Sequence, residues 1–205
     1  MASTIKILIA QYRLPYPLYY SGAEKSTLEL AMVLAEKGLD ITIMFSQAFY
    51  TNEQLEKKLL NEKINYQQTK EGFRYNYKNL VIDIYHETIF FKKYNSFLTQ
   101  YPKAFIFHQP NIYVGYDKKW QQLFSIGENH IYFVRSEESL EPLKNIENKI
   151  RNIITNSEYM KTQVKKKLNR LSTVILPIPH QGCIAKKKQD FAKYITFFNP
   201  VEVKG

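Results

Sequence analysis

The sequence predicts an α/β fold in which helices cover both faces of a doubly wound, mainly parallel sheet, over residues 1–180. Apolar runs that suit buried strands alternate along the chain with segments whose apolar residues recur at helical spacing. The first run, at residues 5–10, is almost continuously apolar, as in strands that are covered on both faces. Such alternation over most of a chain is typical of Rossmann-like parallel sheets.

The first strand is followed by the clearest helical pattern in the chain. Residues 23–37 carry apolar side chains at the spacing of a helix that packs on a sheet, namely Leu28, Ala31, Met32 and Ala35. Gly38 suits the position just after such a helix. Residues 41–45 then form the second strand, so the unit is expected to be a right-handed βαβ crossover.

The rest of the chain continues this alternation less regularly. Further helices are expected at residues 52–60, 90–100, 118–125 and 156–168. Strands are expected at residues 104–108, 130–134, 152–155 and 172–179, while residues 73–77 and 80–86 suit a strand pair or one strand with a lead-in. Asn156 or Ser157 is the expected N-cap of the last helix, and Glu158 lies in its first turn. A polar linker and a new strand follow.

Composition limits the class of protein. The 205 residues are 44% hydrophobic and 23% charged, which is ordinary for a soluble globular protein. The single cysteine, Cys183, allows no intrachain disulfide and suits a reducing compartment. No apolar run approaches the roughly 20 residues that span a bilayer, and the N-terminus lacks the features of a secretory signal. We therefore expect a cytoplasmic protein.

The chain is basic, with a formal net charge of +10, and most of the excess lies in residues 101–205. A basic half suits nucleic acid, an anionic membrane or a phosphorylated ligand, although a solvated helix face explains such runs as well. Four lysines of the helix expected at 156–168 are candidates for contact with an anionic membrane or for solubility alone: Lys161, Lys165, Lys166 and Lys167.

The loop at residues 11–22 is rich in tyrosine and proline and leads from the first strand into the first helix. In doubly wound sheets, ligands bind outside the carboxyl ends of the strands, so this loop lies on the ligand side. Gly22 would let a ligand approach the backbone, and the helix N-terminus favours an anion. Ser21 and Glu24 also suit a capping box, which explains the helix start but not the tyrosines. We expect this loop to contact an anion or a sugar.

Four stretches of sequence stand in the order found in one enzyme family. They are "SGAEKSTLELAMVLAEKG" with "DITIMF", then "FHQP", then "IITNSEYMKTQVKKKL", and finally "ITFFNPVEVKG". Together they resemble family 4 glycosyltransferases, which have the GT-B fold. The family usually has Gly-Gly-Ala-Glu, so Ser21 replaces the first glycine here, and residues 50–100 match no family pattern.

The resemblance implies a two-domain enzyme that transfers a sugar from a nucleotide-sugar donor with retention of configuration. Residues 1–180 would form the N-terminal, acceptor-side domain and residues 181–192 a linker. Residues 193–205 would be the first strand and loop of a truncated C-terminal donor-binding domain. Members of the family use no metal, and no cofactor is expected besides the donor substrate. This chain alone is expected to be inactive because most of the donor domain is missing.

The resemblance also assigns roles to particular residues. His108 would be a catalytic residue that meets the transferred sugar, whereas without the resemblance it suits a hydrogen-bonded histidine at a strand end. Substrate contacts would come from Ser21, Gly22 and Gln109. The donor phosphates would be bound by Lys204 and Asn199, although many members have an arginine in place of Asn199. Fixed dipoles and a lysine stabilise the charge of a leaving diphosphate.

The expected partners are a nucleotide-sugar donor, a glycan, lipid-linked or protein acceptor, and an anionic membrane surface that the protein would bind peripherally. No nucleic acid is expected as a partner. One alternative is a basic module of Rossmann-like fold that binds an anionic surface or nucleic acid, although no recognised nucleic-acid motif is present. Another is a flavodoxin-like or receiver-type domain, although the acidic cluster of a receiver is missing after the first strand.

Overall fold

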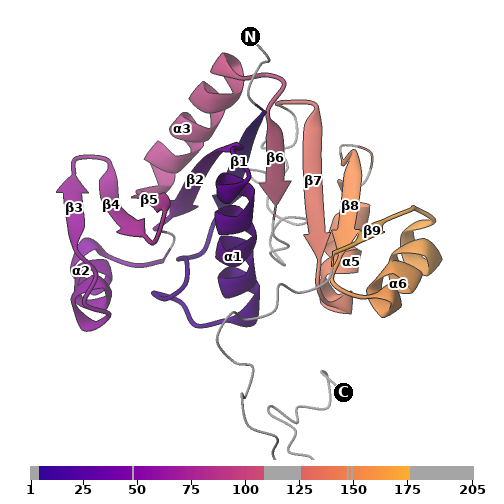
Figure 1. Cartoon of the computed structure of the whole chain (residues 1–205), viewed down its shortest axis with the longest axis horizontal. Coiled ribbons are helices and arrows are strands. Elements are labelled where there is room, and N and C mark those ends of the chain that lie inside the picture. The colour runs from indigo at the N-terminus through magenta and orange to yellow at the C-terminus, as the bar shows by residue number, and fades with distance from the viewer. Residues whose placement is uncertain (1–4, 48, 109–125, 147, 149, 176–205) are drawn as a thin grey trace, which may run out of the picture.

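The computed structural model describes residues 5–47, 49–108, 126–146, 148 and 150–175. These residues form a nine-stranded sheet in the order β3-β4-β5-β2-β1-β6-β7-β8-β9, with helices on both faces (Figure 1). The helix expected at 118–125, the linker at 181–192 and the strand within 193–205 lie outside the described residues. So do three predicted site residues, Gln109, Asn199 and Lys204.

The sheet is parallel except at one edge. Its strands are β1 (Lys6–Gln11), β2 (Asp40–Ser46), β3 (Tyr66–Thr69), β4 (Gly72–Tyr77), β5 (Leu80–Tyr85), β6 (Phe105–His108), β7 (Asn129–Val134), β8 (Asn152–Thr155) and β9 (Thr173–Val174). The β3–β4 and β4–β5 pairs are antiparallel, and the other six neighbouring pairs are parallel. The fold prediction is confirmed.

Helices cover the sheet on both sides because the central strands are apolar on both faces. The helices are α1 (Gly22–Glu36), α2 (Asn52–Asn61), α3 (Glu87–Gln100), α5 (Leu140–Lys144) and α6 (Glu158–Leu168), with a 3₁₀ turn η2 (Glu137–Ser139). In β1, Ile7 and Ile9 pack in a cluster with residues of α1 and α2. Leu8 and Ala10 pack in the opposite cluster, with residues of α3, α5 and α6. None of the helices in the described ranges has the length and hydrophobicity needed to cross a membrane.

The structure identifies the residues that end α1 and begin α6, and it shows the strands at one edge of the sheet. Gly38 has φ +80°, a value that favours glycine, and its N–H donates to the Ala35 carbonyl after α1. Of the two candidate caps of α6, Ser157 is the N-cap, and its Oγ accepts from the Met160 N–H at 3.2 Å. Residues 73–77 and 80–86 do form a strand pair, β4 and β5. The edge strand β3 was not expected, nor were η2 and α5.

Candidate ligand site at the carboxyl edge of the sheet

The strand order reverses beside β1. The chain passes from β1 to β2 on one side, and β6, β7 and β8 then follow one another on the other side. Ala10 of β1 pairs with His108 of β6 in a parallel register, so the loops that follow these two strands start next to each other. A reversal of this kind is where doubly wound sheets bind ligands. That the two loops line one cleft stays a prediction, because residues 109–125 lie outside the described ranges.

The N-terminus of α1 lies at this edge. Ser21 is the N-cap, and its Oγ accepts from the Glu24 N–H at 3.4 Å, so one half of the expected capping box is formed. Gly22 is the first residue of the 15-residue helix, and a Cβ placed on it would meet no atom of the described residues within 4 Å. Nothing in the packing therefore demands glycine here. The open space suits the approach of a ligand to the free N–H groups of the first turn.

Arg135 follows β7 directly and reaches α1. Its Nη2 donates to Thr27 Oγ1 at 2.9 Å, and its guanidinium lies 3.7 Å from the centroid of the Phe133 ring. Its buried Nη1 has no hydrogen-bond partner among the residues that the structure describes. Burial lowers the pKa of Arg135 to about 10, and the nearby Glu24 carboxyl opposes that shift. Arg135 thus remains a cation at neutral pH, close to the N-terminal half of α1.

The side chain of His108, at the end of β6, is buried and lies against His130 of β7. It is 3% exposed, and its Nε2 lies 2.9 Å from Nδ1 of His130, with the two rings stacked at a centroid distance of 5.2 Å. The second ring nitrogen of His130, Nε2, lies 3.0 Å from the Ile126 carbonyl oxygen. Burial, together with the neighbouring His130, holds the pKa of His108 well below its ordinary value. The catalytic role of His108 stays a prediction.

The loop that follows β1 is anchored by two leucines, and its tyrosines range from half-buried (Tyr12 and Tyr16) to exposed (Tyr19 and Tyr20). Leu14 and Leu18 are 1% and 3% exposed and pack in the cluster under α1. Five rings of this loop and the next form what we call the loop aromatic surface: Tyr12, Tyr16, Tyr19, Tyr20 and Phe49. Two cations lie over its rings, Lys25 over Tyr16 at 5.6 Å and Arg13 over Tyr19 at 5.8 Å.

Phe49 is the most exposed ring of the loop aromatic surface. Its side chain is 76% exposed and meets Tyr12 edge to face at a centroid distance of 5.9 Å. Tyr12 follows β1 and Phe49 follows β2, so the pair lies across the carboxyl ends of two adjacent central strands. An exposed ring at this edge can stack on a sugar or on a base.

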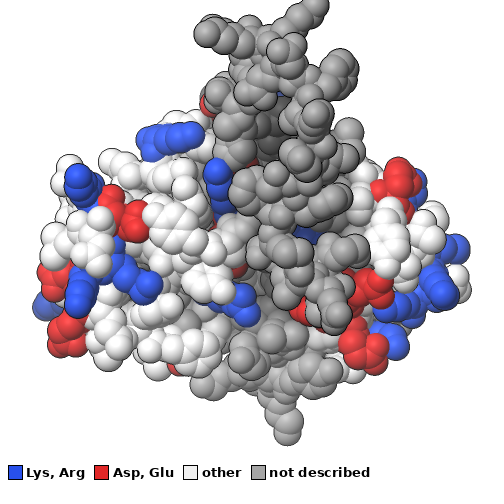
Figure 2. Space-filling view, turned by 90° about the horizontal axis from the view of Figure 1, so that it is seen from below, with Lys and Arg blue, Asp and Glu red and all other residues white. Residues whose placement is uncertain are grey.

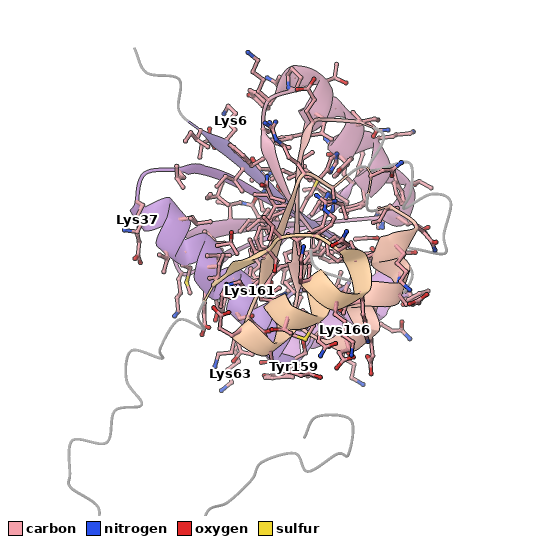
Figure 3. The ribbon with its side chains drawn as sticks, turned by 90° about the vertical axis from the view of Figure 1, so that its right-hand side faces the viewer. Lys6, Lys37, Lys63, Tyr159, Lys161 and Lys166 are labelled. Atoms are coloured by element: carbon pink, nitrogen blue, oxygen red, sulfur yellow. The ribbon has the colours of Figure 1, made fainter. Side chains whose placement is uncertain are left out.

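The lysines of α6 lie at the far end of the molecule, where acidic side chains accompany them (Figure 2). Lys161 pairs with Glu158 at 3.1 Å, and Lys167 pairs with Glu137 of η2. Lys161, Lys166 and Tyr159 are on the outer side of α6 (Figure 3). The cluster is therefore partly neutralised.

The described part of the chain holds no group of side chains able to bind a metal ion.

Comparison with known proteins supports the fold. No family model matches the chain, and no curated protein matches it either. An α-glucosyltransferase, solved in complex with UDP and a 13-mer DNA containing an HMU base, is similar with a TM-score of 0.50 at 13% identity. The match covers 85% of this chain but only 42% of the neighbour. At this identity the likeness supports the Rossmann-like fold alone, and this chain spans less than half of the neighbour's length.

The neighbour also bears on the expected partners. It is bound to DNA, which does not match our expectation that no nucleic acid takes part. That structure also contains UDP. Arg135 and His130 were missed by sequence reasoning. The signal for Arg135 was a basic residue directly after an apolar strand, and His130 opened a strand without any motif around it.

Proposed function

We propose that this chain is the N-terminal, acceptor-side half of a GT-B glycosyltransferase that resembles family 4. The observation that carries the proposal is the pairing of Ala10 with His108 at the reversal of strand order, with the open N-terminus of α1 at the same edge. This arrangement is what a doubly wound sheet uses to bind a ligand. The likeness to a glucosyltransferase makes a sugar nucleotide the favoured donor.

In this proposal the reaction is a retaining transfer that needs neither metal nor cofactor. The acceptor lies against the loop aromatic surface and the first turn of α1, at Ser21 and Gly22. Gln109 completes the substrate contacts beside His108. The donor diphosphate is met by Lys204 and Asn199, within a C-terminal domain that begins at residues 193–205. Positive charge and fixed N–H dipoles stabilise the diphosphate as it leaves.

The test separates ligand binding from transfer. Saturation-transfer NMR on this chain with methyl glycosides, UDP-, ADP- and GDP-sugars should show contact to glycosides and weak or no contact to the nucleotides. Transfer should be seen only for the polypeptide that continues past residue 205, if its reading frame encodes a donor domain. Tight nucleotide binding by residues 1–180 alone would contradict the division of roles. Absence of transfer by a longer chain that binds both substrates would contradict the reaction.

A second candidate is that the acceptor is DNA. It is favoured by the DNA in the neighbouring structure and by the cations that lie over the rings of the loop aromatic surface. Exposed rings interleaved with positive charge stack bases of single strands without sequence preference. Fluorescence titration with a single-stranded 13-mer should then give an affinity that falls steeply with salt. Phe49→Ala should weaken it, and Leu60→Ala, which removes a side chain 62% exposed on α2, should not.

A further inference from the structure

Two buried histidines and one backbone carbonyl form a chain of hydrogen bonds behind the carboxyl edge. Nε2 of His130 lies 3.0 Å from the Ile126 oxygen, and Nδ1 of His130 lies 2.9 Å from Nε2 of His108. A carbonyl oxygen can only accept a hydrogen bond. The proton of a neutral His130 is therefore on Nε2, and its Nδ1 is left as an acceptor.

The position of the proton on His108 follows from that on His130. Because Nδ1 of His130 accepts, Nε2 of His108 must carry the proton that is donated across the 2.9 Å contact. A neutral imidazole carries one N–H, so Nδ1 of His108 is unprotonated and can only accept. Burial holds the pKa of His108 well below its ordinary value, which keeps the ring neutral at pH 7.

The Ile126 carbonyl oxygen, which begins this series of hydrogen bonds, precedes a turn at Gly127. Gly127, between Ile126 and the start of β7, has φ +88°, which favours glycine. A Cβ at Gly127 would lie 2.8 Å from Cδ1 of Ile106 in β6. The positive φ therefore favours glycine there, whereas Cδ1 of Ile106 is the end of a flexible side chain that can shift.

We propose that His130 is a positioning residue that fixes His108 as the Nε2–H tautomer and so presents its Nδ1 as a hydrogen-bond acceptor. The proposal deepens the proposed function and rests on it for its consequence. A tautomer of this kind receives a hydrogen bond from a hydroxyl of the sugar and does not donate one. His130 itself touches no reacting atom in this scheme, because it acts through His108.

Long-range ¹H–¹⁵N spectra of the ¹⁵N-histidine-labelled chain report which ring nitrogen carries each proton, and the chain has only four histidines to assign. For wild type we expect the Nε2–H form of His108 to exceed the other by about fivefold or more, since one hydrogen bond distinguishes them. His130→Asn places an amide oxygen near the position of Nδ1 and should keep the tautomer. His130→Leu removes the acceptor and should give a mixture.

Different results test the tautomer of His108 and its contact with a sugar. A wild-type His108 that carries its proton on Nδ1 overturns the proposal, and so does an unchanged tautomer in His130→Leu. The wild-type spectrum decides the matter even if the leucine variant does not fold. Addition of a methyl glycoside tests the consequence separately. If no glycoside perturbs the His108 ring while the Nε2–H tautomer is present, the proposed sugar contact fails and the positioning by His130 stands.

Discussion

Arg135 joins the end of β7 to α1, because its Nη2 donates to Thr27 Oγ1 at 2.9 Å across 108 positions of sequence. The contact crosses the carboxyl edge of the sheet between two elements that border the candidate site. Thr27 is fully buried, and its hydroxyl also donates to the Ala23 carbonyl within α1. A buried cation with few partners needs each of its hydrogen bonds.

We predict that Thr27→Val lowers the free energy of unfolding by about 1–3 kcal/mol, because it leaves Nη2 of Arg135 buried without its acceptor. In the Arg135→Met background, Thr27→Val should lower the free energy of unfolding much less, because no buried cation then needs the Thr27 hydroxyl. Urea unfolding of the four proteins in this double-mutant cycle measures the difference. Additive effects of the two substitutions would mean that the contact contributes nothing.

Alanine substitutions at Gly22 and Gly72 give a second prediction, because the two glycines differ in backbone conformation and in the space around them. Gly22→Ala should leave the fold intact and stabilise it by about 0.4–1 kcal/mol, because a Cβ there meets no described residue within 4 Å and alanine lowers the entropy of the unfolded chain. The added methyl should nonetheless weaken glycoside contact in saturation-transfer NMR. In Gly72→Ala a Cβ would lie 2.0 Å from the Ile84 oxygen at φ +146°, so this variant should lose stability. If Gly22→Ala binds glycosides like wild type, the ligand does not approach this turn.

The buried state of His108 gives a prediction about pH. Its pKa in the folded protein is lowered by burial and by His130, so below about pH 6.5 the unfolded chain binds a proton that the folded chain does not. Stability should therefore fall as the pH is lowered from 6.5 toward 5, by up to about 1.4 kcal/mol per pH unit for this one group. In His108→Gln that contribution is absent, so urea unfolding between pH 7.5 and 5 should show a shallower fall. Equal slopes in the two proteins would contradict the lowered pKa.

The parts of the fold that sequence predicted are those whose signal is local. Nearly continuous apolar strands, a helical stripe and the turn residue Gly38 each depend on neighbours along the chain. Strand β3 was missed because its residues, Tyr-Gln-Gln-Thr, are largely exposed at the sheet edge and are held by pairing with β4. The short α5 was missed because Pro142 lies within its five residues.

The candidate site was predictable only in part for the same reason. The alternation of strands and helices predicted that the loops after β1 and β6 lie at the carboxyl edge. The residues around Ser21 were enough to predict its role as a helix cap. The partners of Arg135 and His108 come from other elements, at sequence distances of 108 and 22 residues. Hydrogen bonds of that range leave no trace in the spacing of residues, so only the structure reveals them.

The lysines of α6 give the last prediction, which concerns an anionic membrane. A lysine near an anionic bilayer is worth about 1 kcal/mol of attraction, so four of them could hold the protein at the surface at low salt. Lys161 and Lys167 already face Glu158 and Glu137, which reduces what they offer to lipid. We therefore expect binding to anionic vesicles to rise in Glu137→Gln/Glu158→Gln.

Binding should be lost when all four lysines of the cluster are changed to glutamine. The matched control removes the same charge from four exposed lysines in the first half of the chain: Lys57, Lys63, Lys70 and Lys78. Co-sedimentation with anionic and neutral vesicles at two salt concentrations compares the proteins, and only the α6 variant should fail to bind anionic ones. If both quadruple variants lose binding equally, net charge alone explains it. If wild type does not bind, the cluster is a solvated helix face.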